Sequence, residues 1–320
     1  MNQVPDEQNR QPPQRTERVA VVVVMYNSET LMPGLIDSLP GGMGSIDYEL
    51  IAVDNASPDD SVAVVRALAD DVTIVETGRN GGYAAGINAG VAAASPYTAI
   101  LALNSDVRLN PGCVPVLLRR LRTPGTGIAV PHLVDATGSL IGSIRREPTI
   151  MGTLAEAILG RRAGRRGLPG EVVNDPEQYR YEHRIDWAEG STQLISAQCW
   201  QACGPWDESF FLYSEETEFN LRARDGGFHT VFVPEAGAVH LEGGSGSSDD
   251  LWALQVVNRV RLYGRRHTRL AAWLFWAANL MREGLRAVLG KSRSRAAVKA
   301  LFNPGRFLRR TVPGQSGKEM

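Results

Sequence analysis

The sequence predicts an α/β fold with a mostly parallel central sheet flanked by helices. Strand-like and helix-like segments alternate through the first hundred residues, which is typical of βαβ units. The segment Val19–Met25 is a continuous run of mainly β-branched residues, as expected for a strand buried on both faces of a parallel sheet. With 43% hydrophobic content, 320 residues suffice for a large core of this kind.

The N-terminal half contains four predicted strands with helices between them. The strands are Val19–Met25, Tyr48–Val53, Val72–Glu76 and Thr98–Leu103, and the helices are Glu29–Ser38, Ser61–Ala69 and Ala84–Ala94. Open parallel sheets bind ligands at the carboxyl ends of their strands. The candidate binding residues are therefore those that follow three of these strands, namely Tyr26 and Asn27, Asp54 and Asn55, and Asn104, Ser105 and Asp106.

The C-terminal half is predicted to extend this domain and then to change character. Residues Gly160–Asp186, rich in Arg, Gly and Pro, are typical of a long surface loop. Further strands are expected at Thr192–Ser196, Phe228–Val233 and Ala238–His240, and the Gly- and Ser-rich segment Gly243–Ser248 breaks the chain before a helical tail. We therefore expect a disordered tail over residues 1–18, an α/β domain over 19–248 and a basic, amphipathic helical extension over 249–320.

The net charge of −1 conceals a strong asymmetry along the chain. Between Arg259 and Arg310 there are 14 Lys and Arg residues and one acid, Glu283, whereas residues 1–258 hold 19 basic and 33 acidic residues. A basic block usually contacts nucleic acid or anionic lipid. Because the attached domain is acidic, the expected partner is an anionic membrane surface and no nucleic acid.

The cysteines and the N-terminus both favour a cytoplasmic location. Cys113, Cys199 and Cys203 are odd in number and lack zinc or redox spacing, so they are expected to be small hydrophobic residues in a reducing compartment. The first eighteen residues are polar and contain no apolar segment typical of a signal peptide.

A cluster of carboxylates between Trp206 and Arg222 is the main candidate for catalysis. The aromatic run Phe210–Tyr213 is followed at once by Glu215 and Glu216, and Ser214 is expected to cap a helix that ends at Gly226. An acid behind aromatic side chains can be partly desolvated and serve as a general base. Acids in a first helical turn also occur as simple helix-stabilising residues.

Three other segments suggest binding of a nucleotide and a metal. Asp54 ends a strand before a polar turn, which suits a nucleobase or ribose but also an ordinary Asx turn. Residues Asn80–Asn88 are glycine-rich and permit close approach of a ligand next to a helix N-terminus, without the order of a dinucleotide or Walker motif. Asp106, with diphosphate oxygens and His240, would form a site for Mg²⁺ or Mn²⁺, although a single His at a strand end is often structural.

Taken in order, these motifs resemble the inverting family-2 glycosyltransferases of the GT-A fold, and most closely their rhamnosyltransferase-like branch. The resemblance extends from Val19 to Ser247 and is carried by the segments Val22–Ser28, Val53–Ser57, Asn80–Asn88, Leu103–Asp106, Trp206–Phe219 and His240–Ser245. It departs from the family where Glu215-Glu216 replaces a usual Glu-Asp pair, and where Asn104 replaces the first Asp of a metal motif.

The resemblance implies a role for each candidate residue. Glu216 falls on the catalytic-base position with Glu215 beside it, and Asp106 and His240 fall on the metal site. The implied donor-binding residues are Tyr26, Asn27, Asp54, Asn55, Asn80, Gly81, Gly82, Tyr83, Asn88, Asn104 and Ser105. The implied acceptor side and site wall comprise Glu189, Gly190, Tyr213, Glu218 and Arg222.

The implied activity is transfer of a sugar, plausibly rhamnose, from a nucleotide-diphospho-sugar to a lipid-linked or polysaccharide acceptor of the cell envelope. Two alternatives stay open: a hexosyltransferase that uses a UDP- or GDP-sugar, and a non-catalytic module that binds sugar nucleotides. The implied location is the inner face of the plasma membrane, as a peripheral protein.

The basic tail contains an apolar segment, Leu270–Leu280, that is too short to span a bilayer. Trp273 and Trp276 lie within it and arginines flank it, which suits a helix in the membrane interface. The alternative is a helix that packs on the domain and leaves a solvated basic side.

Overall fold

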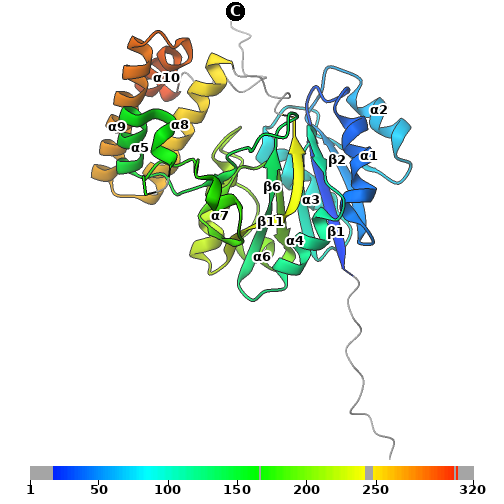
Figure 1. The fold of residues 1–320 in the computed structure, drawn as a ribbon. Coiled ribbons are helices and arrows are strands. Elements are labelled where there is room, and N and C mark those ends of the chain that lie inside the picture. Colours follow the sequence, from blue (N-terminus) through cyan, green and yellow to red (C-terminus); the bar gives the residue numbers. More distant parts are fainter. Residues whose placement is uncertain (1–16, 166, 242–247, 306–307, 309–320) are drawn as a thin grey trace, which may run out of the picture.

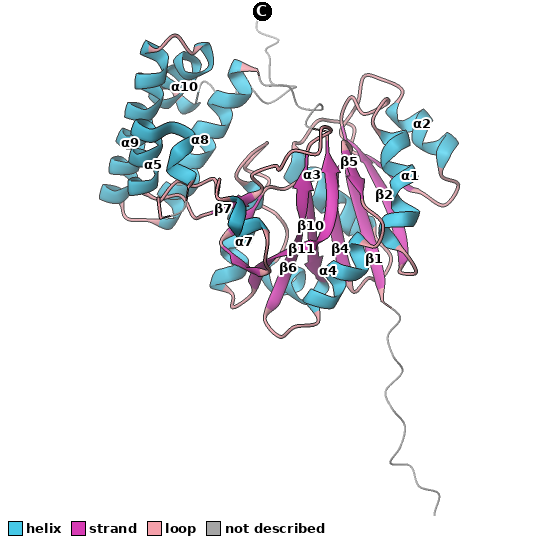
Figure 2. Cartoon of the chain, in the orientation of Figure 1, coloured by secondary structure: helices cyan, strands magenta, loops and turns pink. Residues whose placement is uncertain are grey.

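The computed structural model describes residues 17–165, 167–241, 248–305 and 308. Residues 1–16 of the expected N-terminal tail and nearly all of the Gly- and Ser-rich break lie outside the described residues, and Arg18, expected in the tail, begins the first strand. The described chain forms a twisted sheet covered by helices, next to a separate group of helices (Figures 1 and 2). The strand order is β3-β2-β1-β4-β10-β6-β11-β5, with β8 paired to β11.

The parallel half of the sheet matches the prediction. Its strands are β1 (Arg18–Met25), β2 (Asp47–Asp54), β3 (Thr73–Glu76) and β4 (Ala99–Asn104). They pair in parallel with β1 between β2 and β4, and β2 next to β3. Their carboxyl ends therefore meet at one edge of the sheet, which is where the polar candidate residues follow.

The other half of the sheet mixes parallel and antiparallel pairs. It contains β5 (Val107–Leu109), β6 (Thr126–Val134), β8 (His183–Ile185), β10 (Thr192–Ser196) and β11 (His229–His240), while β7 (Ile144–Arg145) and β9 (Trp187–Ala188) form a separate pair. The two predicted strands Phe228–Val233 and Ala238–His240 are one strand, β11. A register shift between Val233 and Gly237 bends it without ending it, as β-bulges do.

Helices cover both faces of the sheet. The hydrophobic core on one face includes residues of α1 (Met32–Met43), α2 (Ser61–Leu68) and α4 (Cys113–Leu121), and the core on the other face includes α3 (Tyr83–Ala93), α6 (Ala197–Cys203) and α7 (Glu215–Asp225). Helix α1 begins later than predicted because the Ser28 carbonyl accepts hydrogen bonds from the amides of Leu31 and Met32, which form a turn. All three cysteines are free thiols; Cys113 and Cys199 are buried as expected, whereas Cys203 is only partly buried.

A second group of helices, the helical lobe, comprises α5 (Ile150–Leu159), α8 (Asp249–Arg266), α9 (Arg269–Val288) and α10 (Ser292–Phe302). Helix α5 comes from the middle of the chain yet lies among the C-terminal helices, as its green colour shows in Figure 1. It is followed by two 3-10 turns, η1 (Gly160–Gly164) and η2 (Pro176–Tyr179), inside the segment predicted as a surface loop.

Several arginines of α8, the helix before the apolar segment Leu270–Leu280, pack on the sheet domain. Arg261 and Arg265 lie over the Phe210 ring, at 5.0 and 4.8 Å from its centre, and Arg265 forms an ion pair of 2.5 Å with Asp207. Trp276 of α9, expected at a membrane interface, is half-buried, and its indole donates a hydrogen bond of 3.2 Å to a carbonyl of α10. Within the described ranges, no helix is both long and apolar enough to cross a bilayer.

Candidate active site

A cavity of about 830 Å³ lies at the carboxyl ends of β1, β2 and β4 and extends to the helical lobe. It brings together most of the residues predicted to form the site. The predicted residues that line it are Tyr26, Asn55, Asn80, Gly82, Tyr83, Asn104, Ser105, Asp106, Glu189, Gly190, Tyr213, Glu215, Glu216 and His240. The predicted residues that do not line it are Asn27, Asp54, Gly81, Asn88, Glu218 and Arg222.

Three of the predicted residues outside the lining, Asp54, Asn88 and Glu218, make contacts with other parts of the protein. Both carboxylate oxygens of Asp54 accept the Ser57 amide at 3.2 Å, in the Asx-type turn that the sequence left open. The Asn88 side chain bonds the backbone N–H and C=O of Trp206, each at 2.9 Å. Glu218 forms a 2.8 Å ion pair with Arg222, which stabilises α7 from within.

The glycine-rich loop contributes side chains and backbone shape to the cavity. Gly82 has a φ of +89°, and a Cβ there would lie 1.9 Å from the Phe211 carbonyl oxygen, so only glycine fits. The Gly82 amide donates to the Asn80 side chain at 3.1 Å, and the Tyr83 amide donates to the Phe211 carbonyl at 3.0 Å. Since both amides are already bonded, they are not available to an anion as the sequence suggested.

The ends of β1, β2 and β4 are connected to one another by polar side chains. Ser28 donates a buried hydrogen bond of 3.0 Å to Ser105, and the Asn55 amide group donates to the Gly82 carbonyl at 2.9 Å. The backbone N–H of Asn104 donates a hydrogen bond to the Ser191 carbonyl, also at 2.9 Å. These contacts fix the floor of the cavity against the loop that carries Glu189.

Asp106, His240 and Glu189 form a chain of polar contacts at the cavity. His240 ends β11 beside β5, which places its Nε2 atom 3.2 Å from Asp106 and its Nδ1 atom 3.2 Å from Glu189. Burial lowers the pKa of His240, but the hydrogen bonds to the two carboxylates outweigh burial and raise it to about 10. The imidazole therefore carries a proton on each nitrogen between two carboxylates.

Glu215 and Glu216 enter the cavity from a backbone turn of unusual conformation. Tyr213 and Ser214 adopt φ values of +68° and +77°, in the left-handed region that non-glycine residues rarely adopt. The expected Ser214 cap is absent, because this residue makes no side-chain capping bond and instead continues the left-handed turn. The turn is therefore held by contacts from elsewhere.

The two glutamates differ in burial and in ionisation. Glu215 is 2% exposed, and burial, together with the neighbouring charge of Glu216, raises its pKa well above the ordinary value. Glu216 is only partly buried, and burial raises its pKa to about 7. Among the described residues, one carboxylate oxygen of each glutamate has no hydrogen-bond partner. Glu216 is thus the acid that changes protonation near neutral pH, as a general base requires.

Tyr83 connects these two groups of acids. Its hydroxyl donates to the Gly190 carbonyl at 3.0 Å, and a Cβ on Gly190 would lie 3.3 Å from Glu216 and 3.6 Å from the Tyr83 ring. Burial raises the pKa of Tyr83 well above its usual value, and the charges of Glu215, Glu216 and Asp106 add to this effect. Tyr83 therefore stays a neutral phenol between the glutamates and Asp106.

Two residues of the site carry no sequence motif and were missed. Asn258, fully buried on α8, donates to the carbonyls of Leu212 and Tyr213 at 2.9 and 3.2 Å, and so supports the turn that precedes Glu215. Arg145, at the end of β7, lines the cavity, and its positive charge lowers the pKa of Glu216 against the effect of burial. No local pattern in the sequence marks either residue, because both reach the site only through tertiary structure.

Comparison with known proteins agrees with this geometry. A profile of glycosyl transferase family 2 matches residues 20–175. The N-acetylglucosaminyl-diphospho-decaprenol L-rhamnosyltransferase of Mycobacterium tuberculosis is 27% identical over 246 residues, which cover 73% of this chain and 79% of that protein. The low-salt glycan biosynthesis hexosyltransferase Agl10 of Haloferax volcanii is 28% identical over 209 residues, which cover 64% of this chain and 61% of that protein.

Solved structures support the fold independently. A mannosyltransferase from Pyrobaculum calidifontis, PcManGT, solved in complex with GDP-Man and Mn²⁺, superposes with a TM-score of 0.57 at 14% identity. The match covers 91% of this chain and 77% of the mannosyltransferase. The fold is therefore GT-A, and the chain contains a glycosyl transferase family 2 domain over residues 20–175 and is a glycosyltransferase.

Proposed function

We propose that this protein transfers rhamnose from a nucleotide-diphospho-sugar to a hydroxyl of a glycan carried on a polyprenyl diphosphate, with inversion at the anomeric carbon. The supporting observation is the position of Glu216, a partly buried carboxylate with a pKa of about 7, in a cavity that also contains Asp106 and His240. The rhamnosyl donor and the diphosphate-linked acceptor are those named for the relative from Mycobacterium tuberculosis. Because the relative from Haloferax volcanii is a hexosyltransferase, another hexose is the alternative donor sugar.

In the proposed reaction, Glu216 removes the proton of the acceptor hydroxyl. The hydroxyl oxygen forms a bond to the anomeric carbon while the bond from that carbon to the diphosphate breaks, and its electron pair leaves with the nucleoside diphosphate. The Glu216 carboxylic acid then releases its proton to solvent. Tyr83 and Glu215 remain neutral, which limits the negative charge that the leaving diphosphate would meet.

The residues at Asp106 fit a divalent cation. Asp106 offers a carboxylate oxygen, and His240 would offer its Nε2 atom at the same point once a cation displaces the proton held there in the metal-free site. Glu189 can hold the remaining Nδ1 proton, as carboxylates do behind metal-bound histidines. Among the described residues no group of three or more His, Cys, Asp or Glu could hold a metal, so water and diphosphate oxygens would complete the coordination. A bound Mg²⁺ or Mn²⁺ would neutralise the leaving diphosphate.

The central experiment compares Glu216→Gln with Glu215→Gln. Loss of a general base costs about 10²- to 10⁴-fold in rate, so Glu216→Gln should lose transfer and keep donor affinity, measured by calorimetry with Mn²⁺. Glu215→Gln keeps the neutral state that burial already favours and should be milder. If Glu215→Gln is the inactive variant and Glu216→Gln stays active, the assignment of the base is wrong. A wild-type protein that binds donor and never hydrolyses or transfers it would instead favour the non-catalytic module.

We further propose that the helical lobe contacts an anionic membrane through an apolar stripe on α9. Leu270, Trp273, Leu274, Met281, Leu285 and Val288 recur at helical spacing and are 40% to 88% exposed. Met151 and Ile158 of the adjacent α5 are 67% and 76% exposed. Large exposed apolar side chains grouped on two packed helices are typical of an interaction site. Arg269 and Lys291 flank the stripe, which favours anionic lipid over a neutral partner.

Sedimentation with anionic vesicles tests this surface in the full chain. The double substitution Trp273→Ala and Val288→Ser should reduce the bound fraction, and high salt should reduce it further by screening the basic residues. Leu68→Ser, which removes an exposed leucine of α2, is the matched control and should bind as the wild type does. Equal binding of all three proteins would refute the proposed surface.

A further inference from the structure

The cavity has a second end, within the helical lobe, that the transfer step does not use. It is lined there by Trp252, Arg259, Arg282 and Arg293, and Arg145 lies between this end and Glu216. Arg145 forms a backbone bridge with Val172, next to Glu171, and its guanidinium lies 3.9 Å from Glu189, whose neighbour Gly190 lies against Glu216. Glu216, Arg145 and these arginines therefore line one continuous cavity, in which a ligand with its hydroxyl at Glu216 can extend past Arg145.

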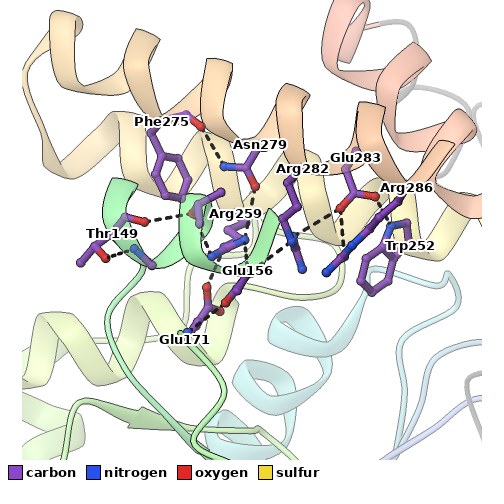
Figure 3. A network of polar contacts seen from close by, with 12 residues as sticks. Thr149, Glu156, Glu171, Trp252, Arg259, Phe275, Asn279, Arg282, Glu283 and Arg286 are labelled. Atoms are coloured by element: carbon purple, nitrogen blue, oxygen red, sulfur yellow. Dashed lines mark hydrogen bonds and ion pairs between the residues drawn. The ribbon is translucent and has the colours of Figure 1, made fainter. Parts of the chain in front are cut away.

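A buried ion-pair network forms the wall of this end (Figure 3). Its contacts are Arg259 with Glu156 (3.4 Å) and Glu171 (2.6 Å), Arg282 with Glu156 (3.2 Å) and Glu283 (3.4 Å), and Arg286 with Glu283 (3.3 Å). Figure 3 shows these side chains converging from α5, α8 and α9. The network also holds Trp252, whose indole donates to Glu283 at 2.9 Å.

The network and its neighbours hold more positive than negative charge. The arginines are Arg145, Arg259, Arg282, Arg286 and Arg293, and the glutamates are Glu156, Glu171 and Glu283, which leaves two positive charges. Burial raises the pKa of Glu171, which shifts this balance further toward positive charge. Glu189 lies 3.9 Å from Arg145 but is shared with His240 and Ser191, so it offsets only part of the Arg145 charge. Buried positive charge is costly unless it is paired.

Two guanidinium groups pack against the Trp252 ring at this end of the cavity. Arg282 and Arg293 lie 5.7 and 4.7 Å from the centre of the Trp252 ring. Arg282 pairs with Glu156 through its Nε atom and with Glu283 through one terminal nitrogen, which leaves its other terminal nitrogen without a carboxylate partner in the ion pairs of the described residues. Arg293 has no carboxylate within ion-pair distance in that same part of the chain, although it lines the cavity. One guanidinium group can donate two parallel hydrogen bonds to a phosphate, so two such groups that line one cavity suit a diphosphate.

We propose that Arg282 and Arg293, with Arg145, form a binding site for the diphosphate group of the acceptor, separate from the donor site at Asp106. This inference rests on the proposed function for the identity of the acceptor. Two excess positive charges match the two negative charges of a diphosphate diester. Such a site would fix the acceptor by its diphosphate and leave the sugar hydroxyl at Glu216.

Calorimetry with geranyl diphosphate in EDTA tests the site in the full chain. The chelator removes divalent cations, so binding at Asp106 is suppressed and the arginines remain. Arg293→Gln should weaken binding about tenfold, since a hydrogen bond to a charged group is worth about 1.5–3 kcal/mol and 1.4 kcal/mol is a factor of ten. Arg295→Gln is the matched control, because Arg295 lies on the same helix, is exposed and does not line the cavity. Arg293 is also exposed, so neither substitution should impair folding.

The outcomes separate this site from the proposed function. Equal affinity of the Arg293→Gln and Arg295→Gln proteins, or no binding to the wild type, would overturn the site. Inorganic pyrophosphate that binds and responds to Arg293→Gln in the same way would support recognition of the diphosphate itself. Hydrolysis of the nucleotide sugar with Mn²⁺ and without acceptor should be unchanged in the control variant Arg295→Gln. A wild-type protein that binds the nucleotide sugar and neither hydrolyses nor transfers it would refute the proposed function, while its binding of geranyl diphosphate would still support the diphosphate site.

Discussion

The left-handed turn before Glu215 gives a quantitative prediction about Asn258. Tyr213 and Ser214 each cost roughly 1–2 kcal/mol in the left-handed conformation. Asn258 opposes this cost with two hydrogen bonds to carbonyls of the turn. Each neutral bond contributes about 1 kcal/mol, so Asn258 supplies about 2 kcal/mol, which is comparable with the strain. Asn258→Leu keeps the side-chain volume and removes both bonds, so the turn should relax and move Glu216.

Asn258→Leu is expected to lower the rate of the transfer step and to leave the affinity for the donor unchanged. If the lost 2 kcal/mol appears in the barrier, kcat falls about 30-fold. Donor affinity should stay within about twofold, because Asn55, Asn80 and Asp106 lie on other elements. The assay is steady-state transfer, with separate kcat and KM, alongside calorimetry of the donor with Mn²⁺. A variant that loses thermal stability but keeps its kcat would show that Asn258 is structural only, and would refute the argument that α8 positions the base.

Further predictions concern the pH profile, the glycine loop and the metal site. Transfer should rise with pH through about 7, as the Glu216 base loses its proton, and a flat kcat between pH 5.5 and 8.5 would contradict this role. The pKa of Glu216 is higher in the folded than in the unfolded protein, so the folded protein loses stability as the pH rises from the unfolded pKa of this residue through about 7. Glu216→Gln should therefore melt higher than the wild type at pH 8 and similarly below pH 4. Gly82→Ala should lower the melting temperature far more than Gly78→Ala does. Both glycines have a positive φ, but only a Cβ at Gly82 would clash with a backbone oxygen, that of Phe211. Asp106→Asn should abolish metal-dependent donor binding in calorimetry and keep the fold, and unchanged affinity would remove Asp106 from the metal site.

The sequence predicted the parts of the site that short segments encode. A buried strand followed at once by polar residues places Asn55 and Asp106 at the same edge of the sheet, and the run before Glu215 marks the start of α7. Capping was predicted less well. Ser214 has the right residue type for a helix cap, but the left-handed turn, supported from α8, takes precedence over that local preference.

The arginines were harder to interpret, because charge alone does not reveal burial. Arg259 and Arg282 belong to the block that suggested a membrane surface, yet both are buried against Glu156 of α5. Helix α5 precedes Arg259 by about a hundred residues, so no local pattern could reveal this pairing. Trp276 likewise packs on α10, while Trp273, three residues earlier on α9, stays exposed.

The position of these charges connects the helical lobe to catalysis. The acidic sheet domain attracts the basic C-terminal helices, and α8 docks through pairs such as Arg265 with Asp207, which lies in the loop that leads to α7. The same helix presents Asn258 to the catalytic turn and Arg259 to the wall of the cavity. A single docking event therefore both orders the turn before Glu216 and completes the basic end of the cavity. Loss of the ion pair between Asp207 and Arg265 should therefore lower kcat, because the turn before Glu215 loses support, and should also weaken diphosphate binding, because Arg259 is displaced. A defect confined to the donor site would change neither diphosphate binding nor the turn.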